Sequence, residues 1–189
     1  MVRSLTLVLS GAFFIAAAAR ADLELTPKLL AYRADGATLK HLEFFDAGKP
    51  VTYQSPRGWD YSGSATQLTL RPRNKAQAEA TITRIPLSQP GNLDEESLKK
   101  LVGDAVAKLP QGSESISVVS QEKNQIMIEH KETFLIMLSY TFYGQKYGRS
   151  ILLMNRGNEQ IRFQLTCHEA DFSQLHQAFL RSQYTWRNL

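Results

Sequence analysis

The sequence predicts a fold of the α/β class (α+β), a mainly antiparallel β-sheet with helices packed on it. Short β-rich segments separated by turn residues fill residues 51–85 and 115–167. Two segments, 93–109 and 172–183, instead have apolar residues at helical spacing. The stretch TFLIMLSYTFY at 133–143 is apolar on both faces, which is typical of a strand that is covered on both sides. We therefore expect an α/β sandwich.

The N-terminus has the pattern of a signal peptide. Arg3 precedes an apolar run from Leu5 to Ala19, and Ala19-Arg20-Ala21 places small residues where a signal peptidase reads them. A helix that spans a bilayer needs about 20 apolar residues, and this run is shorter. We expect cleavage after Ala21 and an exported protein, periplasmic or extracellular, with no stable membrane span after cleavage. An uncleaved N-terminal anchor is the alternative.

Composition limits the class of partner and the number of domains. The chain has 22 Lys and Arg against 18 Asp and Glu, and loss of residues 1–21 removes two arginines and no acid. The remaining net charge of about +2 and the short basic run RPRNK predict no nucleic-acid partner. A single cysteine excludes an internal disulfide. We divide the chain into a signal peptide (1–21), a segment without an assigned element (22–43) and one domain (44–189).

Four strands are expected before the first helix. Pro56 and Gly58 favour a turn after the first of them, because proline presets one dihedral angle and glycine permits a positive φ. In the third, Leu68 and Leu70 alternate with polar residues, which places one face on the core. The four strands are Val51–Gln54, Trp59–Ser62, Thr66–Arg71 and Ala78–Ile85.

The segment NLDEESLKKLVGDAVAKLPQG predicts an amphipathic helix. Asn92 is the expected N-cap, with Glu95 three residues later as in a capping box. Pro110 and Gly112 end the helix. Its apolar stripe consists of Leu98, Leu101, Val102, Ala105 and Leu109.

Five strands and a closing helix are expected in the second half. The last strand passes into a helix from about Phe172 to Gln183, with Asp171 as its N-cap. A turn at Asn155–Asn158 separates the last two strands. The strands are Ser115–Gln121, Gln125–Lys131, Thr133–Tyr143, Arg149–Asn155 and Glu159–Cys167.

The order of these elements resembles the PsbP-like family. The matching pieces are the Pro56-Arg57-Gly58-Trp59 turn, the capped helix Leu93–Leu109, and the strand and helix of Arg162–Leu180. This family includes an extrinsic photosystem II subunit, a Ran-binding nuclear import factor and small bacterial proteins. The ending LRSQYTW departs from the usual Ser-Phe ending. The resemblance implies an α/β/α sandwich, and a binding or assembly role without catalytic machinery.

Cys167 and His168 are the most evident candidates for chemistry. Neighbours in a strand point to opposite faces, so these two side chains do not form a nucleophile–base pair. Cys167 continues the apolar row of Ile161, Phe163 and Leu165. A free cysteine in such a row is expected in the core.

Other catalytic and metal patterns are weak. The histidines His41, His130, His168 and His176 form no pair at metal-ligand spacing, and the sequence has no G-x-S-x-G elbow and no glycine-rich phosphate loop. We expect no catalytic residue, metal or cofactor. The alternative is a small secreted hydrolase or metal-dependent enzyme that uses His168, Glu169 and His176.

Surface recognition is the remaining class of function. Trp59, Tyr61, Tyr143 and Tyr147 lie near strand ends or loops, where aromatic side chains serve as anchors for a partner. They would equally cover the edges of the core. The sequence thus predicts a non-enzymatic binding or assembly factor of the cell envelope, with an unknown protein partner.

Overall fold

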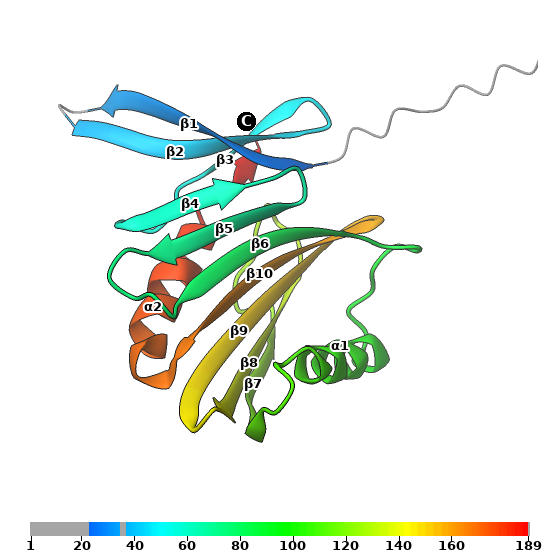
Figure 1. Cartoon of the computed structure of the whole chain (residues 1–189). Coiled ribbons are helices and arrows are strands. Elements are labelled where there is room, and N and C mark those ends of the chain that lie inside the picture. Colours follow the sequence, from blue (N-terminus) through cyan, green and yellow to red (C-terminus); the bar gives the residue numbers. More distant parts are fainter. Residues whose placement is uncertain (1–22, 35–36, 189) are drawn as a thin grey trace, which may run out of the picture.

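The computed structural model describes residues 23–34 and 37–188, so the expected signal peptide lies outside the described residues. The described strands form two antiparallel sheets (Figure 1). The larger sheet has the order β4–β5–β6–β10–β9–β8–β7, and the smaller has the order β1–β2–β3–β11. The larger consists of β4 (Trp59–Gly63), β5 (Gln67–Pro72), β6 (Glu79–Pro86), β7 (Glu114–Lys123), β8 (Thr133–Phe142), β9 (Gln145–Arg156) and β10 (Glu159–His168). The smaller consists of β1 (Glu24–Ala34), β2 (Ala37–Asp46), β3 (Lys49–Tyr53) and β11 (Arg187–Asn188).

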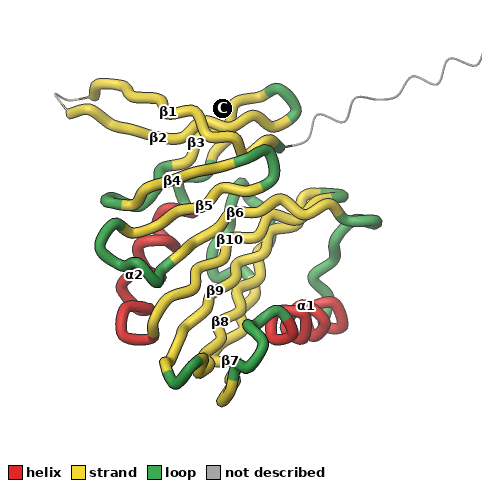
Figure 2. Tube along the Cα trace, viewed as in Figure 1, coloured by secondary structure: helices red, strands yellow, loops and turns green. Residues whose placement is uncertain are grey.

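Two helices cover opposite faces of the larger sheet (Figure 2). The helix α1 (Glu95–Ala107) packs on the face formed by Phe134, Ile136 and Leu138 of β8 and their neighbours on β9. The helix α2 (Glu169–Gln183) and the smaller sheet share the other face and its core. The expected mainly antiparallel sheet with helices packed on it is confirmed. Neither described helix has the length and apolar character needed to cross a bilayer.

The strand β10 alternates as its sequence predicts. Ile161, Phe163, Leu165 and Cys167 point into the core that α2 covers. The side chains between them, including Arg162, lie on the face that carries α1. The pairing register of β10 determines which of its side chains face the core, because a shift of one residue would move the whole apolar row to the other face.

The N-terminal segment to which we assigned no element is part of the core. Leu23 directly precedes β1 of the β1–β2 hairpin and Leu25 is the second residue of β1, and both are fully buried. The Leu25 amide donates to the Ala65 carbonyl at 3.0 Å, which connects β1 to the turn after β4. At Gly63 an added Cβ would lie 2.6 Å from Pro27 Cδ, so this close contact of β1 with β4 requires glycine.

The N-cap of α1 is Asp94, so the prediction of Asn92 was wrong. The Asp94 carboxylate accepts a hydrogen bond from the Ser97 amide at 2.8 Å. Asn92 instead donates to the other Asp94 oxygen at 2.6 Å. The residue directly before the first helical turn has the geometry to reach that amide, which a residue two positions earlier lacks.

Asp171 is not the N-cap of α2, which corrects the second capping prediction. The strand β10 continues through His168, and the helix begins at Glu169 with Asp171 already in its first turn. Asp171 accepts a hydrogen bond from Lys75 Nζ at 2.7 Å. A carboxylate in the first turn still favours the helix dipole.

The predicted strand Gln125–Lys131 is a loop apart from one bridge between Ile128 and Lys131. Glu129 and His130 have φ angles of 52° and 59°, which turns the chain sharply. Ile126 and Ile128 reach the core from this loop. Because Ile126 and Ile128 are two positions apart and both buried, their pattern resembles that of a strand with one buried face.

Glu129 in that loop is expected to make the stability of the fold depend on pH. Burial raises the pKa of its carboxyl group, and Arg156, Lys131 and the Asn188 amide oppose the rise. A raised folded-state pKa means that stability is fully present below the unfolded value and is lost as pH rises from about 4.3 through the folded value. Glu129→Gln is therefore expected to be more stable than the natural protein at pH 7, with the difference shrinking toward pH 4.

Thermal unfolding of both proteins at pH 4 and pH 7 measures this effect. Glu114→Gln, on exposed β7, is the control, and as an exposed substitution it should change the melting temperature little. A Glu129→Gln variant that loses stability at pH 7 would show that its charge is favourable in the folded state.

Candidate functional site

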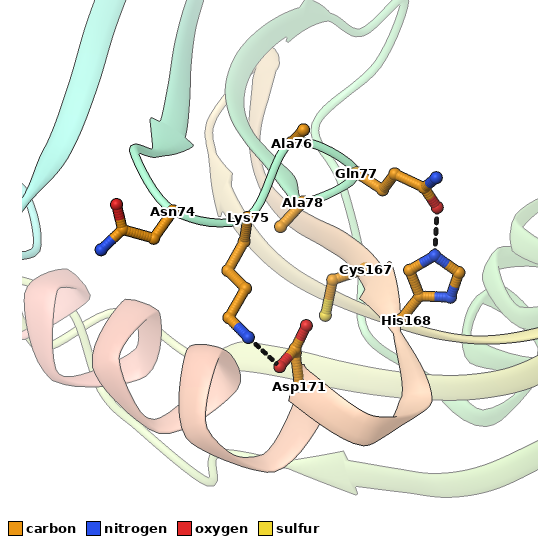
Figure 3. Close-up of a pocket in the computed structure, with 8 residues that line it drawn as sticks. All are labelled: Asn74, Lys75, Ala76, Gln77, Ala78, Cys167, His168 and Asp171. Atoms are coloured by element: carbon orange, nitrogen blue, oxygen red, sulfur yellow. Dashed lines mark hydrogen bonds and ion pairs between the residues drawn. The ribbon is translucent and has the colours of Figure 1, made fainter.

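A polar pocket of about 280 Å³ lies at the end of β10, where the sequence places Cys167 and His168 (Figure 3). The loop between β5 and β6 forms its other wall. Its lining residues are Asn74, Lys75, Ala76, Gln77, Ala78, Cys167, His168 and Asp171.

Cys167 is a buried thiol in this pocket. Its side chain is 1% exposed, and burial, with a smaller contribution from the Asp171 charge, raises its pKa to about 12. The thiolate is the nucleophilic form of cysteine, and it is scarce at neutral pH when the pKa is this high. The predicted burial of Cys167 is confirmed.

His168 is held by partners on the opposite side of the strand. Figure 3 shows the two side chains diverging from β10. The His168 Nε2 shares a hydrogen bond with Gln77 Oε1, and the Tyr147 hydroxyl donates to the same oxygen at 3.1 Å. Tyr147 also stacks on the imidazole, with ring centroids 4.6 Å apart. Since Gln77 Oε1 accepts both bonds, these contacts fasten the β5–β6 loop to the sheet.

The three residues of the enzyme alternative do not line one site. Glu169 lies outside this pocket, 3.9 Å from Lys146 Nζ. His176 stacks on Phe172 at 5.3 Å, and burial lowers its pKa. Within the described residues no three His, Cys, Asp or Glu side chains are arranged to hold a metal ion.

Cys167 should react slowly with thiol reagents. In folded protein at pH 8 we expect labelling with iodoacetamide to proceed only as the chain unfolds, because the thiol is buried and its pKa is raised. In denaturant the reaction should become fast, since an unperturbed thiol has a pKa of about 8.5. Mass spectrometry at timed intervals measures both rates. Fast labelling of the folded protein would instead indicate an accessible, activated cysteine.

A second and larger cleft, of about 420 Å³, lies between the two sheets. One wall comes from β1 and β2, and the other from β4 with the turn before it. The lining residues are Leu29, Lys40, His41, Leu42, Gln54, Ser55, Pro56, Arg57, Gly58, Trp59, Tyr61 and Arg73.

The Pro56–Trp59 turn builds one end of this cleft. The Trp59 amide donates to the Pro56 carbonyl at 3.3 Å, and Gly58 has a φ of 75°, which favours glycine. The Arg73 amide donates to the Gly58 carbonyl at 3.1 Å and fixes the turn to the end of β5. Arg57 is thereby held at the tip of a fixed turn.

Aromatic side chains line the cleft from β4. Trp59 is 7% exposed and stacks on Phe179 of α2, with centroids 6.2 Å apart. Tyr61, two residues later on the same face of β4, is 37% exposed. Trp59 is therefore a fixed wall, and Tyr61 is the aromatic group that a partner can reach.

The charged residues of the cleft are basic. Lys40, Arg57 and Arg73 line it, and no acidic residue does so within the described part of the chain. Arg73 forms an ion pair with Asp60 at 2.9 Å. Lys40 and Arg57 are exposed and have no ion-pair partner among the described residues. The cleft therefore has a net positive charge.

The four predicted binding residues divide between two places. Trp59 and Tyr61 line the cleft between the sheets. Tyr143 is 88% exposed at the tip of the β8–β9 hairpin, and Tyr147 packs between Tyr140 and His168. Sequence reasoning missed Arg57, although it lies inside the quoted turn motif.

The comparisons bear on the fold alone. No protein-family model matches the chain, and no curated protein does. Among solved structures, the cyanobacterial PsbP (CyanoP) of Synechocystis sp. PCC 6803 is 11% identical, with a TM-score of 0.52, and the match covers 96% of this chain and 99% of that one. A Pseudomonas aeruginosa protein of unknown function is 14% identical, with a TM-score of 0.47, over 83% of this chain and 94% of that one. The likeness to CyanoP shows a PsbP-like fold, as the sequence motifs predicted.

Proposed function

We propose that this protein is an exported, non-enzymatic binding or assembly factor of the cell envelope, whose protein partner binds in the cleft between the two sheets. The observation that carries the proposal is the lining of that cleft, where accessible Tyr61 lies beside the basic side chains of Arg57 and Lys40. Tyrosine and arginine are enriched among residues that dominate binding energy at interfaces. Export rests on the signal-peptide pattern of residues 1–21.

The geometry at the end of β10 favours binding over the enzyme alternative. A catalytic site needs several polar groups that converge on one reacting atom. His168 is bonded to Gln77, Asp171 to Lys75, and His176 packs against Phe172. Each of these three side chains therefore interacts with another side chain of the same protein. The PsbP-like fold is compatible with many functions and assigns none.

Site-specific photo-crosslinking in the producing cell tests the proposal. The chain carries p-benzoylphenylalanine in place of Tyr61 and keeps its own N-terminus. We expect a discrete crosslinked protein after irradiation, because Tyr61 faces the proposed partner. The matched control carries the same group in place of Tyr184, which is also an exposed tyrosine but lies at the end of α2. Equal or absent adducts at the two positions would contradict a binding role for the cleft.

A further inference from the structure

We propose that the cleft between the sheets takes an extended, acidic polypeptide segment, which adds as a strand along the free edge of β4. This inference rests on the proposed function and names the chemistry of the partner. Its three supports are an unpaired strand edge, a slot that opens along that edge, and uncompensated positive charge.

The edge of β4 is available for pairing. β4 pairs with β5 alone among the described strands, and it ends the order of the larger sheet. The Arg73 amide donates to the Gly58 carbonyl, and the Ser64 amide donates to the Gln67 carbonyl. Backbone groups alternate in direction along an antiparallel strand, so those of Tyr61 face away from β5. One residue of an added strand could therefore exchange two hydrogen bonds with Tyr61.

The slot beside this edge is closed at one end and open at the other. At Gly63 the edge is in contact with β1, where an added Cβ would lie 2.9 Å from the Leu25 carbonyl oxygen. From this contact β1 and β4 diverge toward the Trp59 end, as Figure 1 shows. The cleft occupies the space between them, with Leu29 of β1 and Lys40 and Leu42 of β2 on its far wall. An extended chain fits this shape better than a compact ligand.

The basic side chains that line the cleft favour an acidic partner. Arg57 is at the tip of the turn at the open end, and Lys40 lines the wall of the cleft that the other sheet forms. Neither side chain has an ion-pair partner within the described residues, and no carboxylate lines the cleft there. Successive side chains of a strand point to opposite faces, so an acidic residue at every second position would present its carboxylates to one wall. Leu29, 47% exposed, offers an apolar contact beside them.

The recognition mode is strand addition, in which main-chain hydrogen bonds supply affinity and side-chain contacts supply specificity. A free phosphate or another small anion would use Arg57 and Lys40 without involving the Tyr61 amide. A neutral extended segment would use the amide without the two cations. These differences make the three possibilities separable.

The test uses the purified protein and three probes: a ten-residue peptide of alternating glutamate and valine, the same peptide with glutamine for glutamate, and inorganic phosphate. Calorimetry measures the dissociation constant, and hydrogen exchange followed by NMR measures protection of the Tyr61 amide. We expect the glutamate peptide to bind at least about tenfold more tightly than the glutamine peptide, with a weaker difference at high salt. We also expect protection of the Tyr61 amide in that complex alone.

Two pairs of variants assign the effect to residues. Arg57→Glu should weaken binding of the glutamate peptide about tenfold or more. The same charge change at Lys100, an exposed residue of α1, should leave binding within about twofold. Tyr61→Pro removes the outward amide, and Tyr61→Ala removes the ring and keeps the amide. Proline is tolerated at the outward positions of an edge strand, so the fold should persist in both. We expect the proline variant to bind more weakly than the alanine variant.

Equal binding of the two peptides would overturn the acidic preference. Binding of phosphate with the affinity of the glutamate peptide, or peptide binding without protection of the Tyr61 amide, would overturn strand addition. If the Tyr61 crosslink forms in cells while the glutamate peptide fails to bind, the proposed function stands and this inference falls. If neither occurs, both fall.

Discussion

Trp186→Ala is expected to lower the free energy of unfolding by about 3–5 kcal/mol, the range for deleting a buried tryptophan side chain. Trp186 is 2% exposed and lies between the two sheets. It stacks on Phe44 with centroids 5.7 Å apart, packs against Tyr53 at 6.1 Å and meets the edge of Phe163 at 5.6 Å. The alanine variant would leave a cavity among these rings.

Chemical denaturation of three proteins measures the effect. Tyr184→Ala, an exposed position two residues earlier, should change the free energy of unfolding by less than about 0.5 kcal/mol. Trp186→Phe should lose much less than Trp186→Ala, because the Trp186 Nε1 is buried without a hydrogen-bond partner among the described residues. A Trp186→Ala protein as stable as Tyr184→Ala would show that the C-terminal segment is not part of the core.

Leu25→Ala is expected to lower the free energy of unfolding by about 2–5 kcal/mol, because it too would leave a cavity in the core. Leu25 is fully buried in the core that joins the two sheets, and its amide is bonded to Ala65. The loss should therefore weaken the contact of the N-terminal hairpin with the turn after β4. That turn is close to Gly63, where the cleft is closed.

Leu29→Ala is the matched control, because Leu29 is in the same strand and is 47% exposed. It should change stability by less than about 0.5 kcal/mol. Thermal unfolding shows the contrast as well, since each kcal/mol corresponds to roughly 2–4 °C for a domain of this size. Equal melting temperatures for the two variants would mean that β1 contributes nothing to the folded core.

Periodicity predicted the elements with one buried face. Apolar residues occur at every second position in β5 (Leu68, Leu70) and in β10 (Phe163 to Cys167), because these side chains form the buried face of each strand. The helix α1 was predicted for the same reason, at a period of 3.6. The turn before Trp59 was predicted from Pro56 and Gly58, and the positive φ of Gly58 explains why glycine is favoured there.

Features that depend on distant contacts were not predicted. Leu23 and Leu25 belong to a core that both sheets build, and the Leu25 amide is bonded to Ala65, 40 residues away, which no local pattern indicates. Ile126 and Ile128 imitate a strand, and only the positive φ angles of Glu129 and His130 distinguish the loop. The sequence predicted no cleft, although Trp59 and Tyr61, which it named as candidate anchors for a partner, both line the cleft. Lys40 could not be added, because its wall is the hairpin that the sequence left without an element.

The protein is proposed to act through the cleft between its sheets rather than through the pocket at the end of β10. The most direct test is the yield of the position-61 crosslink in cells when Arg57→Glu or His168→Asn is added, with matched protein levels and folding checked by circular dichroism. We predict that Arg57→Glu lowers the yield about tenfold, because the charge reversal replaces attraction of an acidic partner by repulsion, and that His168→Asn leaves the yield within about twofold. Loss of the crosslink in His168→Asn with retention in Arg57→Glu would contradict it.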